Sequence, residues 1–233
     1  MTETIKTNQI NEINEINDKA EAAPQESIQQ PAWHVVVLSV FTLGMYNMYW
    51  LWRSLRTLRD CSEALRNQLE LGKNDPAQPE PDLALLGRLE KAGTLRAYFA
   101  FAQARPVLTT VLFAIPIVNL MVLLGFANAA AGLWPDSESV IRKKSKLIAF
   151  VVALIFGSLT LLYLLKEPYQ LLYLSSSLAL FIVQIWLNRH WKLVEGEERL
   201  ARQAFSPVEL VAIVFGAAWI GLIAIHPDLK FYK

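Results

Sequence analysis

Five long apolar runs, separated by polar and charged stretches, dominate the pattern of this chain. They cover residues 33–52, 107–134, 147–165, 171–187 and 207–226. The first run holds no charged residue over 20 positions, and a helix of that length rises about 30 Å, the thickness of a bilayer's hydrocarbon core. The pattern therefore predicts an all-α, polytopic membrane protein with about five membrane-embedded segments.

Polar tails flank the apolar part of the chain. Isoleucine recurs every three residues within residues 1–32, so these side chains drift around a helix and form no buried stripe. The composition there predicts a disordered polar tail, and residues 227–233 form a second, short tail. Residues 33–226 are expected to fold as a single helical membrane domain.

The polar stretch at residues 53–106 is expected to be a cytosolic or interfacial insert. Within it, leucines at helical spacing predict an amphipathic helix over residues 53–72, and these are Leu55, Leu58, Leu65 and Leu69. A second helix is expected over residues 83–104. Both helices are predicted to rest at the membrane interface, with their arginines directed to anionic lipid.

Segment 107–134 allows two topologies. Its 28 residues exceed one span but fall short of the roughly 40 that two spans need, and Pro116 and Asn119 near its middle favour a bend. If it re-enters, Lys and Arg divide 17 to 5 between the two sides of the membrane; if it crosses once, they divide 12 to 10. The positive-inside rule favours the re-entrant form and places residues 53–106 in the cytoplasm, but a kinked single span stays open.

Composition narrows the functional classes. Apolar residues make up 54% and charged residues 18% of the chain, and the net charge is +1. Acidic residues are interspersed among the basic ones, which argues against a nucleic-acid partner. The single cysteine, Cys61, cannot form an intrachain disulfide and is expected to be an inert thiol. The expected partners are the lipid bilayer and another membrane protein, and a homo-oligomer stays open.

Three amides within or beside the apolar segments are the main candidate site. Gln184, Asn188 and Trp191 are spaced i, i+4 and i+7 and so share one helix face. Because unpaired amides are costly in a membrane, we expect Gln184 and Asn188 to meet Asn47 of the first segment in a polar seam. Gly44 would then allow the first and fourth segments to approach closely.

The last apolar segment begins with a capping pattern. Ser206, Pro207 and Glu209 supply a cap, a proline at the first helical position and a carboxylate that can reach back to the Ser206 backbone. Ala217 and Gly221, like Gly125 and Ala129, form a small-residue pair that lets helices touch closely, and such pairs are too common to indicate a dimer.

No catalytic residue, metal ligand or cofactor site is assigned from the sequence. It holds no paired-histidine motif, phosphate-binding loop or nucleophile elbow. The favoured function is a scaffold, envelope or partner-binding component of the membrane. A small-molecule transporter or channel subunit is the alternative. An interfacial lipid-modifying enzyme that uses His190 ranks last, so the sequence favours a non-enzymatic protein.

A motif near the first segment resembles an uncharacterised bacterial membrane family, domain of unknown function 4234. Its signature T-L-G-x-Y-x-x-Y-W is matched by Thr42, Leu43, Gly44, Tyr46, Tyr49 and Trp50. The order of Gln184, Asn188 and Trp191, and the segment at residues 206–221, are also similar to that family. The resemblance implies a helical protein of the bacterial inner membrane and brings no assigned activity.

Overall fold

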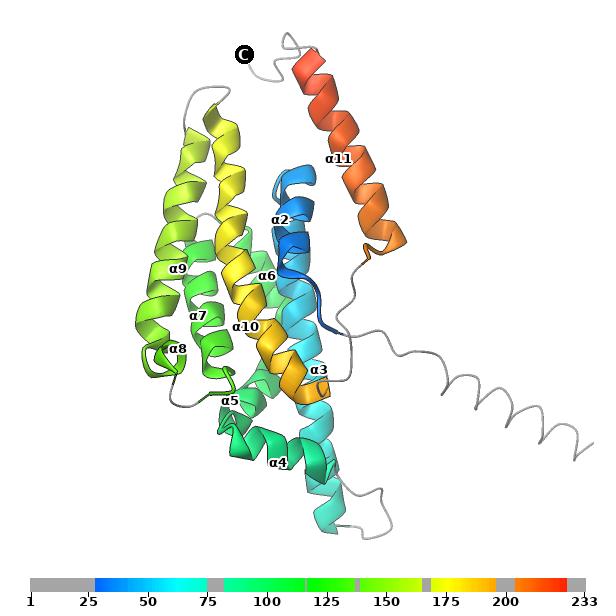
Figure 1. Cartoon of the computed structure of the whole chain (residues 1–233), viewed down its shortest axis with the longest axis vertical. Coiled ribbons are helices and arrows are strands. Elements are labelled where there is room, and N and C mark those ends of the chain that lie inside the picture. The colour runs from blue at the N-terminus through cyan, green and yellow to red at the C-terminus, as the bar shows by residue number, and fades with distance from the viewer. Residues whose placement is uncertain are drawn as a thin grey trace, which may run out of the picture.

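The computed structural model describes residues 28–74, 82–115, 117–136, 139–164, 169–195 and 204–225. Every regular element in these ranges is a helix, so the all-α prediction is confirmed for them (Figure 1). With 3-10 helices marked η, the elements are α2 (Ala32–Phe41), α3 (Met45–Asn74), α4 (Leu83–Lys91), α5 (Leu95–Ala100), η1 (Phe101–Gln103), α6 (Pro106–Phe113), α7 (Val118–Gly132), α8 (Val140–Lys143), α9 (Ser145–Thr160), η2 (Leu161–Leu164), η3 (Tyr169–Ser176), α10 (Ser177–Glu195) and α11 (Pro207–Ile225). Among the described residues, no helix is both long and apolar enough to span a membrane.

The first apolar run, residues 33–52, does not form the single helix expected from its length. The chain turns between α2 and α3 at residues 42–44. Leu43 and Gly44 there have φ angles of 51° and 85°, in the left-handed region that glycine enters without steric cost. The turn reverses the chain, so α2 and the start of α3 form a helical hairpin (Figure 1).

Side chains from both helices and from a distant segment hold this turn. The Thr42 hydroxyl donates to the Leu38 carbonyl at 2.7 Å and accepts from the Tyr46 backbone N–H at 2.9 Å. The Tyr173 hydroxyl, from η3, donates to the Leu43 carbonyl at 2.8 Å. The turn is therefore joined to the segment that leads into α10.

Helix α3 continues without a break into the polar insert. The amphipathic helix expected over residues 53–72 is thus the lower part of one 30-residue helix. Leu55, Leu58 and Leu65 are at most 5% exposed, and α3 packs against η1, α5 and α6. The leucine stripe faces the protein core, which corrects the expectation that it rests on a bilayer surface.

The second helix expected in the insert, residues 83–104, is divided into α4, α5 and η1. Asp82 caps α4 by accepting from the Leu85 N–H at 2.8 Å, and Gly93 ends it with a φ of 65°. The Arg142 guanidinium, at the end of α8, donates to the carbonyls of Ala92 and Gly93. The C-terminus of α4 is therefore held by a cation, as helix C-termini favour.

Segment 107–134 bends, as its length and composition predict. It forms α6 and α7, with a break at residues 114–117 in which Ile117 has a φ of 72°; Pro116 lies outside the described residues. A Cβ atom at Gly132, the end of α7, would lie 3.6 Å from Ala97 in α5. The end of α7 thus returns to the level from which α6 begins.

The third and fourth segments run antiparallel to each other. The third segment, predicted at residues 147–165, forms α9 and η2 as far as residue 164. The fourth, predicted at residues 171–187, forms most of η3 and the first part of α10, which extends to residue 195. The 3-10 helices η2 and η3 contact each other at the top of Figure 1, while residues 165–168 between them lie outside the described residues. Because η3 reaches Leu43, the turn of the α2–α3 hairpin lies at this same end.

Residues 28–31 are ordered, which corrects the expectation of a disordered tail up to residue 32. The Glu195 carboxylate accepts from the Ile28 backbone N–H at 2.6 Å and from the Gln29 amide at 3.0 Å. Gln29 and Gln30 are 1% and 5% exposed. Residues 1–27, to which the rest of that prediction refers, lie outside the described residues.

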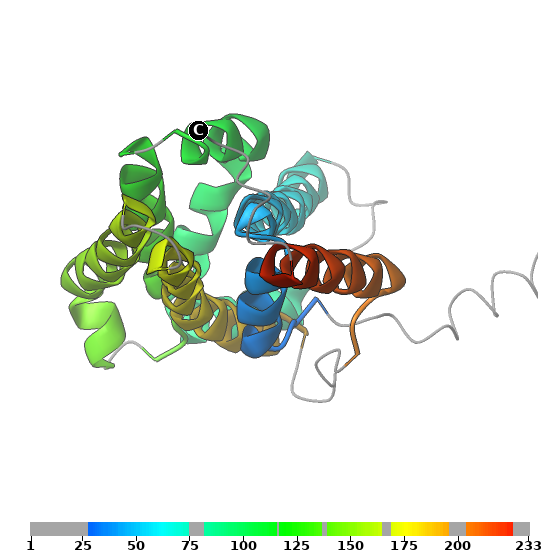
Figure 2. The same cartoon turned by 90° about the horizontal axis from the view of Figure 1, so that it is seen from above.

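Helix α2 lies between α10 and α11 (Figure 2). Its contact with α11 depends on Gly216, where a Cβ atom would fall 1.7 Å from the Phe41 carbonyl oxygen. The core shared by α3 and α7 includes an edge-to-face pair of Trp50 and Phe126, with ring centroids 5.7 Å apart. These contacts position α2, α3, α10 and α11 around a set of buried polar side chains.

Candidate functional site

The amides on α10 bind the chain ahead of α2. Gln184 Nε2 donates to Asn188 Oδ1 at 2.7 Å and to the Gln30 carbonyl at 3.3 Å. Asn188 Nδ2 donates to the same carbonyl at 2.7 Å, and Trp50 Nε1 donates to Gln184 Oε1 at 2.6 Å. Both amides therefore join α10 to residue 30, and Gln184 also joins it to α3.

The third amide of the predicted seam lies elsewhere. The Ser39 hydroxyl donates to Asn47 Oδ1, and no hydrogen bond joins Asn47 to Gln184 or Asn188 among the residues that the structure describes. The turn at residues 42–44 folds α3 back on α2 and so directs Asn47 to that helix. The structure assembles the α10 half of the seam but places Asn47 in the α2–α3 hairpin.

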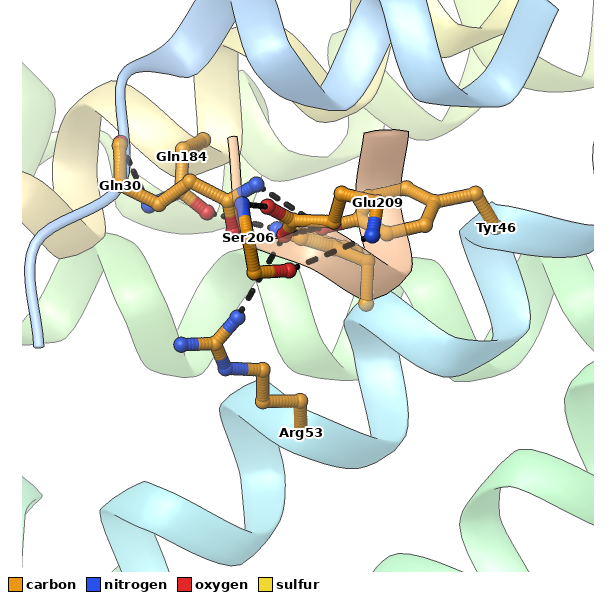
Figure 3. A network of polar contacts seen from close by, with 7 residues as sticks. Gln30, Tyr46, Arg53, Gln184, Ser206 and Glu209 are labelled. Carbon is orange, nitrogen blue, oxygen red and sulfur yellow. Dashed lines mark hydrogen bonds and ion pairs between the residues drawn. The ribbon is translucent and has the colours of Figure 1, made fainter. Parts of the chain in front are cut away.

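A buried carboxylate extends the network to α11 (Figure 3). Gln30 Nε2 donates to the Tyr46 hydroxyl at 2.8 Å, and that hydroxyl donates to Glu209 Oε1 at 3.5 Å. Arg53 Nη1 lies 3.8 Å from the same oxygen. Glu209 is 5% exposed, and burying a carboxylate is costly unless such partners compensate its charge. The network therefore ties α11 to α3.

Glu209 also starts α11. Its Oε2 accepts from the Ser206 backbone N–H at 2.7 Å, and its own N–H donates to the Ser206 hydroxyl at 3.3 Å. These are the two reciprocal hydrogen bonds of a capping box. One carboxylate thus serves both the helix terminus and the contact between helices.

A pocket of about 250 Å³ opens beside this carboxylate. Apolar surface dominates its walls, and Glu209 and the Tyr46 hydroxyl supply polar atoms. The pocket lies between α2, α3 and α11, and its lining residues are Leu38, Thr42, Met45, Tyr46, Tyr49, Ser206, Glu209 and Ala212. Its shape and lining suit an apolar group attached to one polar or charged group.

The remaining motif residues have separate positions. Tyr49 is 46% exposed, whereas Trp50 and Trp191 are 2% and 3% exposed. Trp191 lies beside His190, with ring centroids 5.3 Å apart. The motif at residues 42–50 therefore builds a turn, a hydrogen bond to α10 and part of the pocket wall.

A second buried cluster lies where α3, α5 and α10 meet. His190 and Tyr98 are both 0% exposed, with ring centroids 5.1 Å apart. Neither His190 ring nitrogen nor the Tyr98 hydroxyl has a hydrogen-bond partner among the described residues. Burial lowers the pKa of His190 to about 3, so its imidazole is neutral near pH 7.

Burial likewise raises the pKa of the Tyr98 hydroxyl. The pKa of the Cys61 thiol is also raised, first by burial and then by the charges of Asp60 and Glu195. His190, Tyr98 and Cys61 are therefore all in their uncharged forms near neutral pH. The thiol is the poorly nucleophilic form, in keeping with the inert role expected from the sequence.

Sequence reasoning missed Gln30, Arg53 and Gly216. The sequence places Gln30 in the predicted polar tail, and it gives Arg53 the same expected contact with lipid as the other arginines of the insert. The available signal for Gly216 is its spacing from Ala212, a small-residue pair one turn of helix long. At Gly221, in the neighbouring small-residue pair, nothing lies within 4 Å of a Cβ atom.

Comparison with known proteins finds no protein similar to this chain. No family model matches the chain, and neither a curated protein nor a solved structure matches it. The resemblance at residues 42–50 therefore stays a prediction, and the geometry of the described residues carries the functional argument.

Proposed function

We propose that this chain is an integral protein of the bacterial inner membrane that acts as a scaffold or partner-binding component. The observation that carries the proposal is a set of large apolar side chains that the fold leaves uncovered. Val107, Ile117, Met121 and Phe215 are 68%, 79%, 70% and 72% exposed. These side chains lie on α6, the α6–α7 turn, α7 and α11, and large apolar side chains left uncovered on several elements suit a surface that contacts lipid or another protein.

The boundary of the apolar surface supports a lipid partner. Lys143 and Lys144 are exposed and come directly before α9, whose Leu147 and Leu154 are 57% and 53% exposed. Basic residues followed by lipid-facing apolar ones are typical of the cytoplasmic boundary of a membrane segment. Trp33, which is 49% exposed, is an aromatic residue of the kind enriched at that boundary. On this proposal, residues 53–106 are cytoplasmic.

The use of the polar side chains supports a structural role over a catalytic one. The buried polar side chains form hydrogen bonds between segments of the fold or at a helix cap, as Gln184, Asn188 and Glu209 do. His190, which a lipid-modifying mechanism would need at the interface, is 0% exposed. The cytoplasmic surface of α3, including the exposed Arg66–Glu70 ion pair, is then free to meet a partner.

The membrane assignment is tested by expressing the full chain and washing isolated membranes at alkaline pH. We expect the protein to stay in the pellet and to float with reconstituted liposomes. A matched variant with Val107, Ile117 and Phe215 changed to serine should be extracted more readily. Release of the unaltered protein into the wash would overturn the proposal.

The scaffold assignment is tested by purification from native membranes in mild detergent. A membrane protein in constant ratio to this chain is expected, and alanine at Arg66 and Glu70 should weaken its recovery. The second candidate function, a small-molecule transporter subunit, is favoured by one observation, the pocket beside Glu209. If a small molecule copurifies instead of a protein and is lost from the Glu209→Gln variant, the transporter assignment replaces the scaffold.

A further inference from the structure

The α2–α3 and α6–α7 hairpins each begin with a helix that is shorter than the hydrocarbon core of a bilayer. Helix α2 has 10 residues and α6 has 8, which correspond to rises of about 15 Å and 12 Å. The hydrocarbon core of a bilayer is roughly 30 Å thick. The chain reverses direction after each of these helices, at residues 42–44 after α2 and at residues 114–117 after α6.

The two reversals point toward the same end of the molecule (Figure 1). The α2–α3 turn is bound by Tyr173 of η3, the 3-10 helix directly before α10. At the α6–α7 turn, Leu120 approaches Gly157 near the end of α9, where a Cβ atom would lie 3.0 Å from it. Since η3 packs against α9, both turns belong to the end of the bundle opposite α4 and α8.

Described backbone groups of both turns form hydrogen bonds within the protein. Gly44 N–H donates to the Ser39 carbonyl at 2.7 Å, and the Leu43 carbonyl accepts from Tyr173. In the other turn, Ile115 N–H donates to Leu112 at 3.1 Å. Irregular backbone is tolerated at membrane depth only when its polar groups are paired in this way.

The side chains around the turns are apolar and uncovered. Met45 is 67% exposed, and Ile115 and Ile117 are 45% and 79% exposed. Neither residues 33–52 nor residues 107–134 contain a charged side chain. Acyl chains are the partner that such a surface fits, because no charged group there would lose its hydration.

We propose that residues 33–52 and 107–134 both form re-entrant hairpins whose turns end within the hydrocarbon layer, so that neither segment crosses the membrane. This inference rests on the proposed membrane function and assigns its topology. Four segments then lie on one side of the membrane: residues 1–32, 53–106, 135–146 and 188–206. The last of these is on that side because the chain crosses the membrane outward along α9 and back along α10. That side holds 19 of the 22 Lys and Arg residues, a stronger bias than the 12-to-10 division of single crossings.

Single cysteines in a Cys61→Ser background test the sidedness. Thr7→Cys, Glu63→Cys and Lys144→Cys are treated with a membrane-impermeant maleimide in right-side-out and in inside-out vesicles. The re-entrant form predicts that all three react in the inside-out vesicles alone. Reaction of Thr7→Cys or Lys144→Cys from the side opposite Glu63→Cys would overturn it for the first or second hairpin.

The depth of the turns is measured with nitroxide-labelled lipids in reconstituted vesicles. A fluorophore on Met45→Cys or Ile117→Cys should be quenched several-fold more by a nitroxide near the acyl-chain end than by one at the headgroup. Leu147→Cys, beside the basic residues, is the control and should show the reverse order. Ile115→Cys replaces Ile117→Cys if the latter does not reconstitute.

The outcomes separate the two proposals. Turns quenched chiefly from the headgroup would place the hairpins on the membrane surface and refute the re-entrant form while leaving the protein membrane-bound. If alkaline washing releases the protein, both proposals fail together. If the protein is retained but the three cysteines fall on opposite sides, the membrane assignment stands and the hairpin topology is wrong.

Discussion

Gly216 offers the sharpest test of how α11 joins the rest of the protein. In a Gly216→Ala variant, the new Cβ atom would lie 1.7 Å from the Phe41 carbonyl oxygen and 2.5 Å from its carbonyl carbon. Both neighbours are backbone atoms, so no side-chain rotation relieves the overlap. Helix α11 must move away from α2, and the Glu209 contacts with α3 must weaken with it.

The magnitude follows from two opposing terms. Overpacking of this kind costs roughly 1–3 kcal/mol, whereas replacing a helical glycine by alanine gains about 1 kcal/mol of helix propensity. Gly221→Ala is the matched control, because it lies in the same helix and nothing is within 4 Å of its Cβ position. The propensity terms cancel between the two variants, so their difference reports the overlap alone.

Thermal unfolding in detergent measures this difference. We expect Gly216→Ala to melt below Gly221→Ala, by about 2–4 °C for each kcal/mol in a chain of this size. Equal melting temperatures, or a more stable Gly216→Ala protein, would refute the close approach of α11 to Phe41.

Buried polar groups at three other positions give further measurable expectations. Glu209→Gln should keep the capping box, since glutamine also reaches back to the cap. In denaturant unfolding Glu209→Ala should therefore lose about 1 kcal/mol more than Glu209→Gln; equal losses would contradict a capping role. Because burial lowers the pKa of His190 from 6.5 to about 3, the unfolded chain binds the extra proton, and stability should fall by about 1.4 kcal/mol per pH unit as pH drops below 6.5. His190→Gln should remove that slope, and an unchanged slope would assign it to another group. Since burial and two nearby acids raise the pKa of Cys61, its alkylation by iodoacetamide near pH 8 should be several-fold slower in the folded protein than in denaturant, and equal rates would contradict its burial.

Local interactions explain the parts of the fold that the sequence predicts well. The start of α11 depends on Ser206 and Glu209, three residues apart, and both hydrogen bonds form within that short stretch. The bend in residues 107–134 likewise lies at the position marked by Pro116 and Asn119. The spacing of Gln184 and Asn188 places them one helical turn apart, and they are hydrogen-bonded.

Tertiary contacts decided which partners Asn47, the leucine stripe of α3 and Gln30 meet. Asn47 is directed to Ser39 because the chain reverses at Gly44, and a 20-residue apolar run does not reveal whether it is straight or folded. The leucine stripe of α3 has the same spacing whether it faces lipid or η1 and α5. Gln30 becomes part of the network because Asn188 and Tyr46 bind it from separate helices.

The sequence by itself determined the helical class and the local helix signals, since periodicity, caps and uncharged runs act over a few residues. The hairpin at residues 42–44, the burial of Glu209 against Arg53 and the fit of Gly216 to Phe41 were decided by tertiary structure alone. Each joins residues on different helices, and the free energy of such a contact depends on the packing of the whole bundle.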